Sequence, residues 1–150
     1  MAFPPSPRSN RLQQGYIKLQ RSGNVIVDTS VWVDYLRGRD IRQREALAAL
    51  LQNGQVYMCG VVLAELLAGT RTERDRDRIA TLFRGLPYLE FSRSTWTQAG
   101  LLSANLRARG NTLPLADLLI GALALENGYG VFTRDAHFQS IPNISLYQPA

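Results

Sequence analysis

The sequence has very little of the two residue types that build most soft-metal sites. Cys59 is the only cysteine and His137 the only histidine among the 150 residues. A single cysteine excludes an internal disulfide and a cysteine-rich zinc site, and a single histidine excludes a histidine cluster. Any bound metal must therefore rely on oxygen ligands, which favours Mg²⁺ or Mn²⁺.

Lysine is nearly absent too: Lys18 is the only one. Arginine therefore supplies almost all of the positive charge. Four of the 17 basic residues precede residue 24, where there is no acid, so the remainder carries 13 basic and 12 acidic groups and a net charge of only +1. The charge total therefore does not predict nucleic-acid binding. Arginines cluster at residues 37–44 and 71–78. They suit either bidentate phosphate contacts or solvated helix faces paired with nearby acids.

Long apolar segments are missing as well. No stretch approaches the ~18 consecutive apolar residues that a membrane span needs, and the basic start lacks the apolar core of a secretory signal. We expect a cytoplasmic protein with one domain at residues 24–150. Residues 1–23 contain three prolines and little periodicity. We interpret them as a flexible basic tail, either a mis-assigned start or an expression remnant.

From residue 24 onward, short apolar runs alternate with helical patterns. We predict strands at Val25–Val27, Gln55–Cys59, Tyr88–Phe91, Tyr129–Thr133 and Ile144–Tyr147. We predict helices at Val31–Arg37, from a cap at Asp40 through Leu51, at Gly60–Ala68, at Thr72–Arg84, from a cap at Ser94 or Thr95 to Arg109, and from Pro114 through Glu126. This alternation predicts an α/β fold, a three-layer α/β/α sandwich around a central, mainly parallel sheet.

Two of the predicted strands lead directly to an acidic residue. Asp28 follows the first strand, and Asp135 comes two residues after the strand that ends at Thr133. In open α/β sheets the site lies beyond the carboxyl ends of the strands. Asp28 could instead cap the next helix, although Thr29 or Ser30 could do so, and Asp135 could cap a short helix. The sequence leaves these alternatives open.

Two further acids interrupt apolar helices. Asp117 is the only charged residue from Leu113 to Leu125, and a helix that is apolar all round is buried. The helix dipole offsets an anion by only ~0.3–1 kcal/mol, so burial of this carboxylate calls for a cation. Gly121, one turn later, would let another backbone approach that face. Glu65, within the apolar segment 61–68, needs a partner or rim position, unless it faces solvent at the helix edge.

One shared metal site would account for all four acids. Carboxylates within a few ångströms of one another repel strongly in a partly buried site. A divalent cation resolves that repulsion, and Mg²⁺ accepts oxygen-only ligands. Such a cation can orient water and stabilise in-line displacement at phosphorus.

Four segments resemble the acidic motifs of the PIN-domain VapC toxins. They are Val-Asp-Thr-Ser-Val-Trp (27–32), Ala-Glu-Leu-Leu-Ala-Gly (64–69), Ala-Asp-Leu-Leu-Ile-Gly-Ala (116–122) and Phe-Thr-Arg-Asp-Ala-His-Phe (132–138). The resemblance covers residues 25–148, in the order and spacing of that family. It implies a PIN-like fold, with Mg²⁺ or Mn²⁺ as the cofactor. The ligands that it implies are Asp28, Glu65, Asp117 and Asp135, with Ser30 and Thr133 as hydroxyls beside the metal.

The resemblance also implies an activity and partners. A metal-activated water would hydrolyse RNA phosphodiester bonds, leaving a 5′-phosphate and a 3′-hydroxyl, as in the toxin of a type II toxin–antitoxin system. The protein would form a homodimer. A cognate antitoxin would dock a segment in a groove and reach the metal site with a basic side chain. Arg134 would be either a phosphate contact or a solvated arginine.

Other functions fit the sequence less well. A phosphatase of the haloacid-dehalogenase type needs a second Asp where Ser30 stands, and a receiver domain needs a late Lys that the chain lacks. Ser30 has no base partner, so a nucleophilic serine is not expected. We interpret His137, which precedes Phe138, as a packing residue, and Trp32, Tyr35 and Leu36 as core or groove-lining. A catalytically inactive PIN-like RNA-binding or protein-interaction module remains the alternative.

Overall fold

A parallel four-stranded sheet forms the centre of the protein. The computed structural model describes residues 23–150, so the predicted tail lies outside the described residues except for Gly23. The strands are β1 (Val25–Val27), β2 (Val56–Cys59), β3 (Tyr88–Leu89) and β4 (Gly130–Phe132). Their spatial order is β3-β2-β1-β4, and every neighbouring pair is parallel. The predicted parallel sheet is confirmed, with β1 at its interior.

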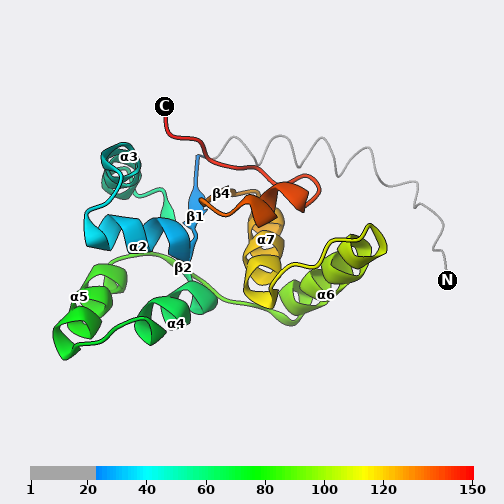
Figure 1. Ribbon diagram of the computed structural model, residues 1–150, viewed down its shortest axis with the longest axis horizontal. Helices are drawn as coiled ribbons and strands as arrows, with labels where there is room; N and C mark the ends of the chain where they lie inside the picture. The colour runs from blue at the N-terminus through cyan, green and yellow to red at the C-terminus, as the bar shows by residue number, and fades with distance from the viewer. Residues whose placement is uncertain (1–22) are drawn as a thin grey trace.

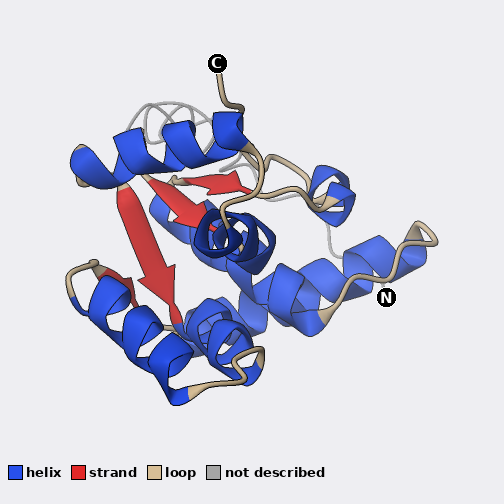
Figure 2. Cartoon of the chain, turned by 60° about the vertical axis from the view of Figure 1, so that its left-hand side comes forward, coloured by secondary structure: helices blue, strands red, loops and turns tan. Residues whose placement is uncertain are grey.

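Helices connect the strands and surround the sheet (Figures 1 and 2). They are α2 (Thr29–Arg37), α3 (Ile41–Gln52), α4 (Gly60–Ala68), α5 (Glu73–Arg84), α6 (Arg93–Ala108), α7 (Leu115–Asn127) and the short 3₁₀ helix η1 (Ala136–Ser140). Helix α7 packs against β1, β4, α4, α6 and η1. No helix within residues 23–150 is long and apolar enough to cross a membrane.

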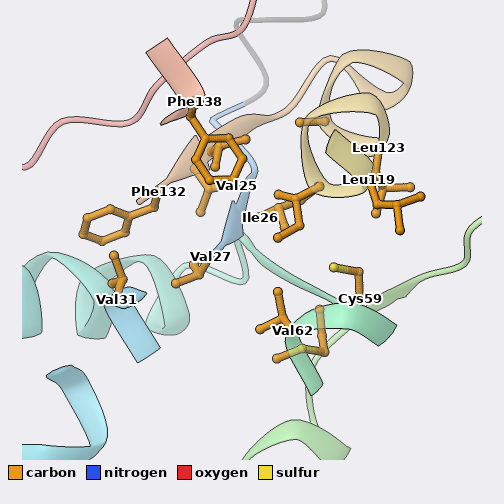
Figure 3. Close-up of a cluster of buried hydrophobic side chains, with 14 of the residues drawn as sticks. Val25, Ile26, Val27, Val31, Cys59, Val62, Leu119, Leu123, Phe132 and Phe138 are labelled. Carbon is orange, nitrogen blue, oxygen red and sulfur yellow. The ribbon is translucent and has the colours of Figure 1, made fainter. Parts of the chain in front are cut away.

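The residues of β1 alternate between two layers of the core (Figure 3). Ile26 points toward Leu119 and Leu123 of α7, whereas Val25 and Val27 point to the other side. All three strand residues are buried. A β-branched strand covered on both faces is typical of a buried parallel sheet. The register places Val27 beside Phe132, so β1 and β4 end side by side.

Most element boundaries differ from the predictions by one or two residues, and three differences have a clear physical reason. Helix α2 begins at Thr29, two residues early, because Asp28 occupies the N-cap position. Helix α6 is capped by Ser92 rather than by Ser94 or Thr95, since Ser92 and Thr95 form a reciprocal capping box. The strand predicted at Ile144–Tyr147 is reduced to an isolated parallel bridge between Leu146 and Val131.

Candidate metal centre

Asp28 lies at the carboxyl end of β1 with its residue surface only 6% exposed. Its backbone takes the N-cap position of α2, but its side chain makes no capping hydrogen bond. The carboxylate oxygen Oδ2 instead accepts hydrogen bonds from Ser30 Oγ and Thr133 Oγ1, each at 2.8 Å. The side chain therefore faces the crevice beyond the strand ends rather than the helix that it precedes.

The two hydroxyls also join α2 to the segment after β4. Ser30 Oγ accepts a hydrogen bond from the backbone N–H of Arg134 at 3.1 Å. Thr133 Oγ1 accepts one from the backbone N–H of Asp135 at 2.9 Å. Because each hydroxyl also donates to Asp28, the two loops and the buried carboxylate form one network. Ser30 and Thr133 thus lie against the Asp28 carboxylate, one of the acids that the resemblance implies as a ligand.

Asp117 lies in the first turn of α7 and is 8% exposed. Burial raises the pKa of its carboxyl above the ordinary value, the hydrogen bond from His137 lowers it, and the nearby Asp28 and Asp135 carboxylates raise it further. The net direction is upward. The helix dipole favours an anion at this end but offsets only a small part of the cost of burial. The site therefore holds a negative charge that a cation would stabilise.

Asp135 and His137 complete the cluster from the start of η1. The side chain of Asp135 caps η1 by accepting a hydrogen bond from the His137 N–H at 2.9 Å. The imidazole Nδ1 lies 3.1 Å from Asp117 Oδ2 and 3.1 Å from Asp135 Oδ1. The ligand atoms of these three residues all lie within 4.8 Å of one another. The prediction that Asp135 could cap a short helix is confirmed, and the same carboxylate faces Asp117.

The interpretation of His137 as a packing residue is wrong. Its side chain is 51% exposed and contacts two acids, whereas its neighbour Phe138 is fully buried and anchors η1 in the core. The sequence held one usable signal. A histidine two residues after a strand-end acid shares a tight turn with that acid, so its ring can point toward the same crevice.

Glu65 stands apart from this cluster. It is exposed on α4, and its Oε1 accepts a hydrogen bond from Thr29 Oγ1 at 3.1 Å. The alternative in which Glu65 faces solvent at the helix edge is confirmed, and Ala64, Leu67 and Ala68 are exposed on the same helix. The bond to Thr29, the neighbour of Asp28, places Glu65 near the rim of the site.

An ion pair beside the site was not predicted from the sequence. Asp34 is 5% exposed, and its carboxylate pairs with the guanidinium of Arg134, whose side chain is half-exposed. Arg134 is therefore held by Asp34 at the edge of the site. The available signal was spacing: Asp34 lies four residues after Ser30 on α2, hence on the same helix face.

Gly121 provides close packing on α7, though not in the way expected. A Cβ at this position would lie 2.6 Å from Cδ1 of Ile141, the residue that follows η1. The group that approaches is thus a buried side chain rather than another backbone. This contact fixes the end of η1 against α7, one turn after Asp117.

The remaining sequence candidates are structural in the described part of the chain. Trp32 is fully buried, with its ring edge-on to Phe83 at a centroid separation of 4.9 Å. Burial raises the pKa of the Cys59 thiol to about 11. Within residues 23–150, no ion pair joins the arginines at 37–44 and 71–78 to an acid. The pairing expected for those helix faces is absent there.

Comparison with known proteins identifies the family. Residues 25–144 match the PIN domain. The chain belongs to the PIN domain family. It is 30% identical over 130 residues to the Mycobacterium tuberculosis protein named Ribonuclease VapC11, covering 84% of this chain and 97% of that protein. It is 31% identical over 119 residues to Ribonuclease VapC32 of the same species, covering 77% and 88%.

Solved structures show the same PIN fold. VapBC2 from Rickettsia felis, bound to a DNA fragment from its promoter, gives a TM-score of 0.72 at 23% identity over 82% of this chain and 96% of that one. FitAcB from Neisseria gonorrhoeae gives 0.70 at 20% identity over 83% and 97%. These likenesses support the three-layer α/β/α arrangement. Identities this low establish the fold alone.

The donor set of the PIN-domain site fits a hard divalent cation. Asp28 and Asp117 are buried, and Asp135 lies close to Asp117. The neighbouring acids contribute to the raised pKa of Asp117, so the carboxylates repel one another. Carboxylate and hydroxyl oxygens are the groups that Mg²⁺ and Mn²⁺ prefer. The chemistry of these residues therefore matches a cation of that class.

Proposed function

We propose that the protein is a metal-dependent endoribonuclease, the toxin of a type II toxin–antitoxin pair. The observation that carries this proposal is the convergence of three acids: Asp28 and Asp135 follow two adjacent strands, and Asp117 faces them from the first turn of α7. The names of the VapC ribonucleases that it resembles support the choice of RNA as substrate. We assign the activity to residues 24–150 and expect the protein in the cytoplasm.

Each site residue has a separate role in the proposed reaction. Asp28, Asp117 and Asp135 would hold Mg²⁺ or Mn²⁺, with Glu65 reaching it directly or through water from the rim. A bound dication would activate a water for attack on the phosphodiester and stabilise charge on the phosphate. The hydroxyls of Ser30 and Thr133 fix the Asp28 carboxylate by donating to it, so that it is already oriented before RNA binds.

A groove next to the rim supports an antitoxin partner. It has a volume of about 430 Å³ and is bordered by Glu65, with apolar side chains such as Val33, Leu36 and Ile79 and arginines at its edge. We propose that an antitoxin segment docks here and extends a basic side chain toward the acids. Several structural neighbours are toxin–antitoxin complexes, which supports this arrangement. We expect a homodimer, as in the family.

The test of this function is RNA cleavage by the purified full-length protein. The wild type should cut RNA in Mg²⁺ or Mn²⁺ but not in EDTA, leaving 5′-phosphate and 3′-hydroxyl ends. Asp28→Asn and Asp117→Asn should each lose at least about a hundredfold in rate, since removal of one metal-site or charge-stabilising group costs this much. Glu45→Gln, at an exposed position on α3, is the matched control and should cut normally.

Two results would count against the proposal. Equal cleavage by the wild type and by both site variants would show that these acids are not the active site. RNA binding without cleavage under any metal would favour the catalytically inactive PIN-like RNA-binding module instead. If the wild type cleaves RNA, sequencing the fragment ends produced in cells would identify the RNA class.

A further inference from the structure

The only histidine of the chain takes up a cation-like position between two acids. His137 Nδ1 lies 3.1 Å from both Asp117 Oδ2 and Asp135 Oδ1. Both sides of this arrangement are fixed by the fold. Asp117 belongs to the buried helix α7, and Asp135 holds the backbone of His137 through the cap of η1.

The distances suit a shared metal ion as well as a hydrogen bond. Two donors at right angles on one ion, each about 2.1 Å from it, lie about 3 Å apart. Nδ1 stands at nearly this separation from one oxygen of each acid. The ring is half-exposed, so it can turn to admit an ion without disturbing the core. Phe138, fully buried next to it, keeps the backbone of η1 in place.

We propose that His137 is a nitrogen ligand of the metal that Asp117 and Asp135 hold. This inference rests on the proposed function and goes beyond it, because the family resemblance implies acids and hydroxyls alone. It also corrects the sequence argument that the metal must rely on oxygen. One histidine cannot build a histidine cluster, but it can supply one nitrogen to an acidic site.

A nitrogen ligand changes which metal the site prefers. Carboxylate and water ligands suit both Mg²⁺ and Mn²⁺, and Mn²⁺ is the weakest binder among the first-row transition metals, but an imidazole nitrogen is a ligand of transition metals rather than of Mg²⁺. A mixed site of carboxylates and one imidazole should therefore bind Mn²⁺ more tightly than Mg²⁺. Loss of the ring should weaken Mn²⁺ binding while it leaves Mg²⁺ binding nearly unchanged.

Pulsed electron paramagnetic resonance of the Mn²⁺-loaded full-length protein tests the ligand directly. The wild type should show hyperfine coupling to an imidazole ¹⁴N. His137→Ala and His137→Gln should lose this signal, and the glutamine variant guards against a simple loss of folding because it keeps a polar side chain. Gln139→Ala, an exposed position on the same short helix, should retain the signal.

Calorimetric titration gives an independent readout. Mn²⁺ affinity should fall at least about tenfold in His137→Ala. Loss of a group that only hydrogen-bonds to a metal ligand already lowers metal affinity by about this factor. Mn²⁺ that binds to the wild type without nitrogen coupling would overturn this inference alone. So would an equal change in Mg²⁺ and Mn²⁺ affinity in the variant. A wild type that binds no Mn²⁺ and cuts RNA in EDTA would overturn the proposed function as well.

Discussion

Asp135→Asn isolates the charge of one acid in the crowded site. The Asp135 side chain both caps η1, through the His137 N–H, and brings its carboxylate close to Asp117. Asparagine has the same size and is an equally good cap. The substitution therefore removes the charge and keeps the local structure. In protein without metal, we expect it to increase the free energy of unfolding.

The size of that increase follows from the separation of the groups. The ligand atoms of Asp117 and Asp135 lie within 4.8 Å of each other. Two unit charges about 5 Å apart repel by roughly 3 kcal/mol at an effective dielectric constant of 20. Because the Asp135 side chain is 36% exposed, solvent screening lowers this value. We expect a gain of roughly 1–2 kcal/mol after that discount.

Urea unfolding in EDTA at low salt and pH 8.5 measures the effect. The gain should shrink in 1 M KCl, because salt screens exposed charges. Asp40→Asn is the matched control: Asp40 caps α3 through the Gln43 N–H at 3.2 Å on an exposed turn outside the site. That variant should stay within about 0.5 kcal/mol of the wild type. The argument that the Asp117 and Asp135 carboxylates repel each other would be refuted by one result. In that result Asp135→Asn is no more stable than the wild type, while Asp40→Asn has no effect.

Three other changes test different parts of the structure. Burial raises the pKa of the Cys59 thiol to about 11 from 9.0, so stability should be intact below pH 9 and fall toward pH 11. The loss should reach at most ~1.4 kcal/mol per pH unit, and urea titrations of Cys59→Ala should lack it. Gly121→Ala puts a Cβ 2.6 Å from Ile141 Cδ1 and should cost about 1–3 kcal/mol. Adding Ile141→Val removes the Cδ1 methyl and should recover most of that cost. If the effects of the two substitutions on the free energy of unfolding simply add, the proposed contact is contradicted. Asp34→Asn weakens the pair with the half-exposed Arg134, so it should lower the free energy of unfolding by about 1 kcal/mol and slow RNA cleavage. An unchanged urea midpoint would speak against that role.

The fold was predictable because local patterns and the global arrangement agree. The β-branched run at Val25–Val27 can be satisfied only by burial on both faces, and glycines such as Gly38 and Gly128 end their helices with positive φ. The errors fall at boundaries. The cap of α6 at Ser92 depends on its reciprocal bonds with Thr95, and several neighbouring residues there could equally well cap a helix.

The candidate site was predictable in part. Asp28 and Asp117 stand out because an acid that follows a buried strand or interrupts an apolar helix needs a compensating partner. The contact of His137 with Asp117 and the Asp34–Arg134 pair were missed, because the partners lie 20 and 100 residues apart in the sequence. Such contacts depend on how η1 meets α7 and how α2 meets the segment after β4, which composition and periodicity do not encode.

Anomalous diffraction from Mn²⁺-soaked crystals of the full-length protein tests the convergence of charge most directly. We predict one strong manganese peak in the crevice beyond β1 and β4, within bonding distance of the Asp117 and Asp135 carboxylates and near Asp28. A crystal with no peak there, or with manganese bound only elsewhere on the surface, would contradict the account.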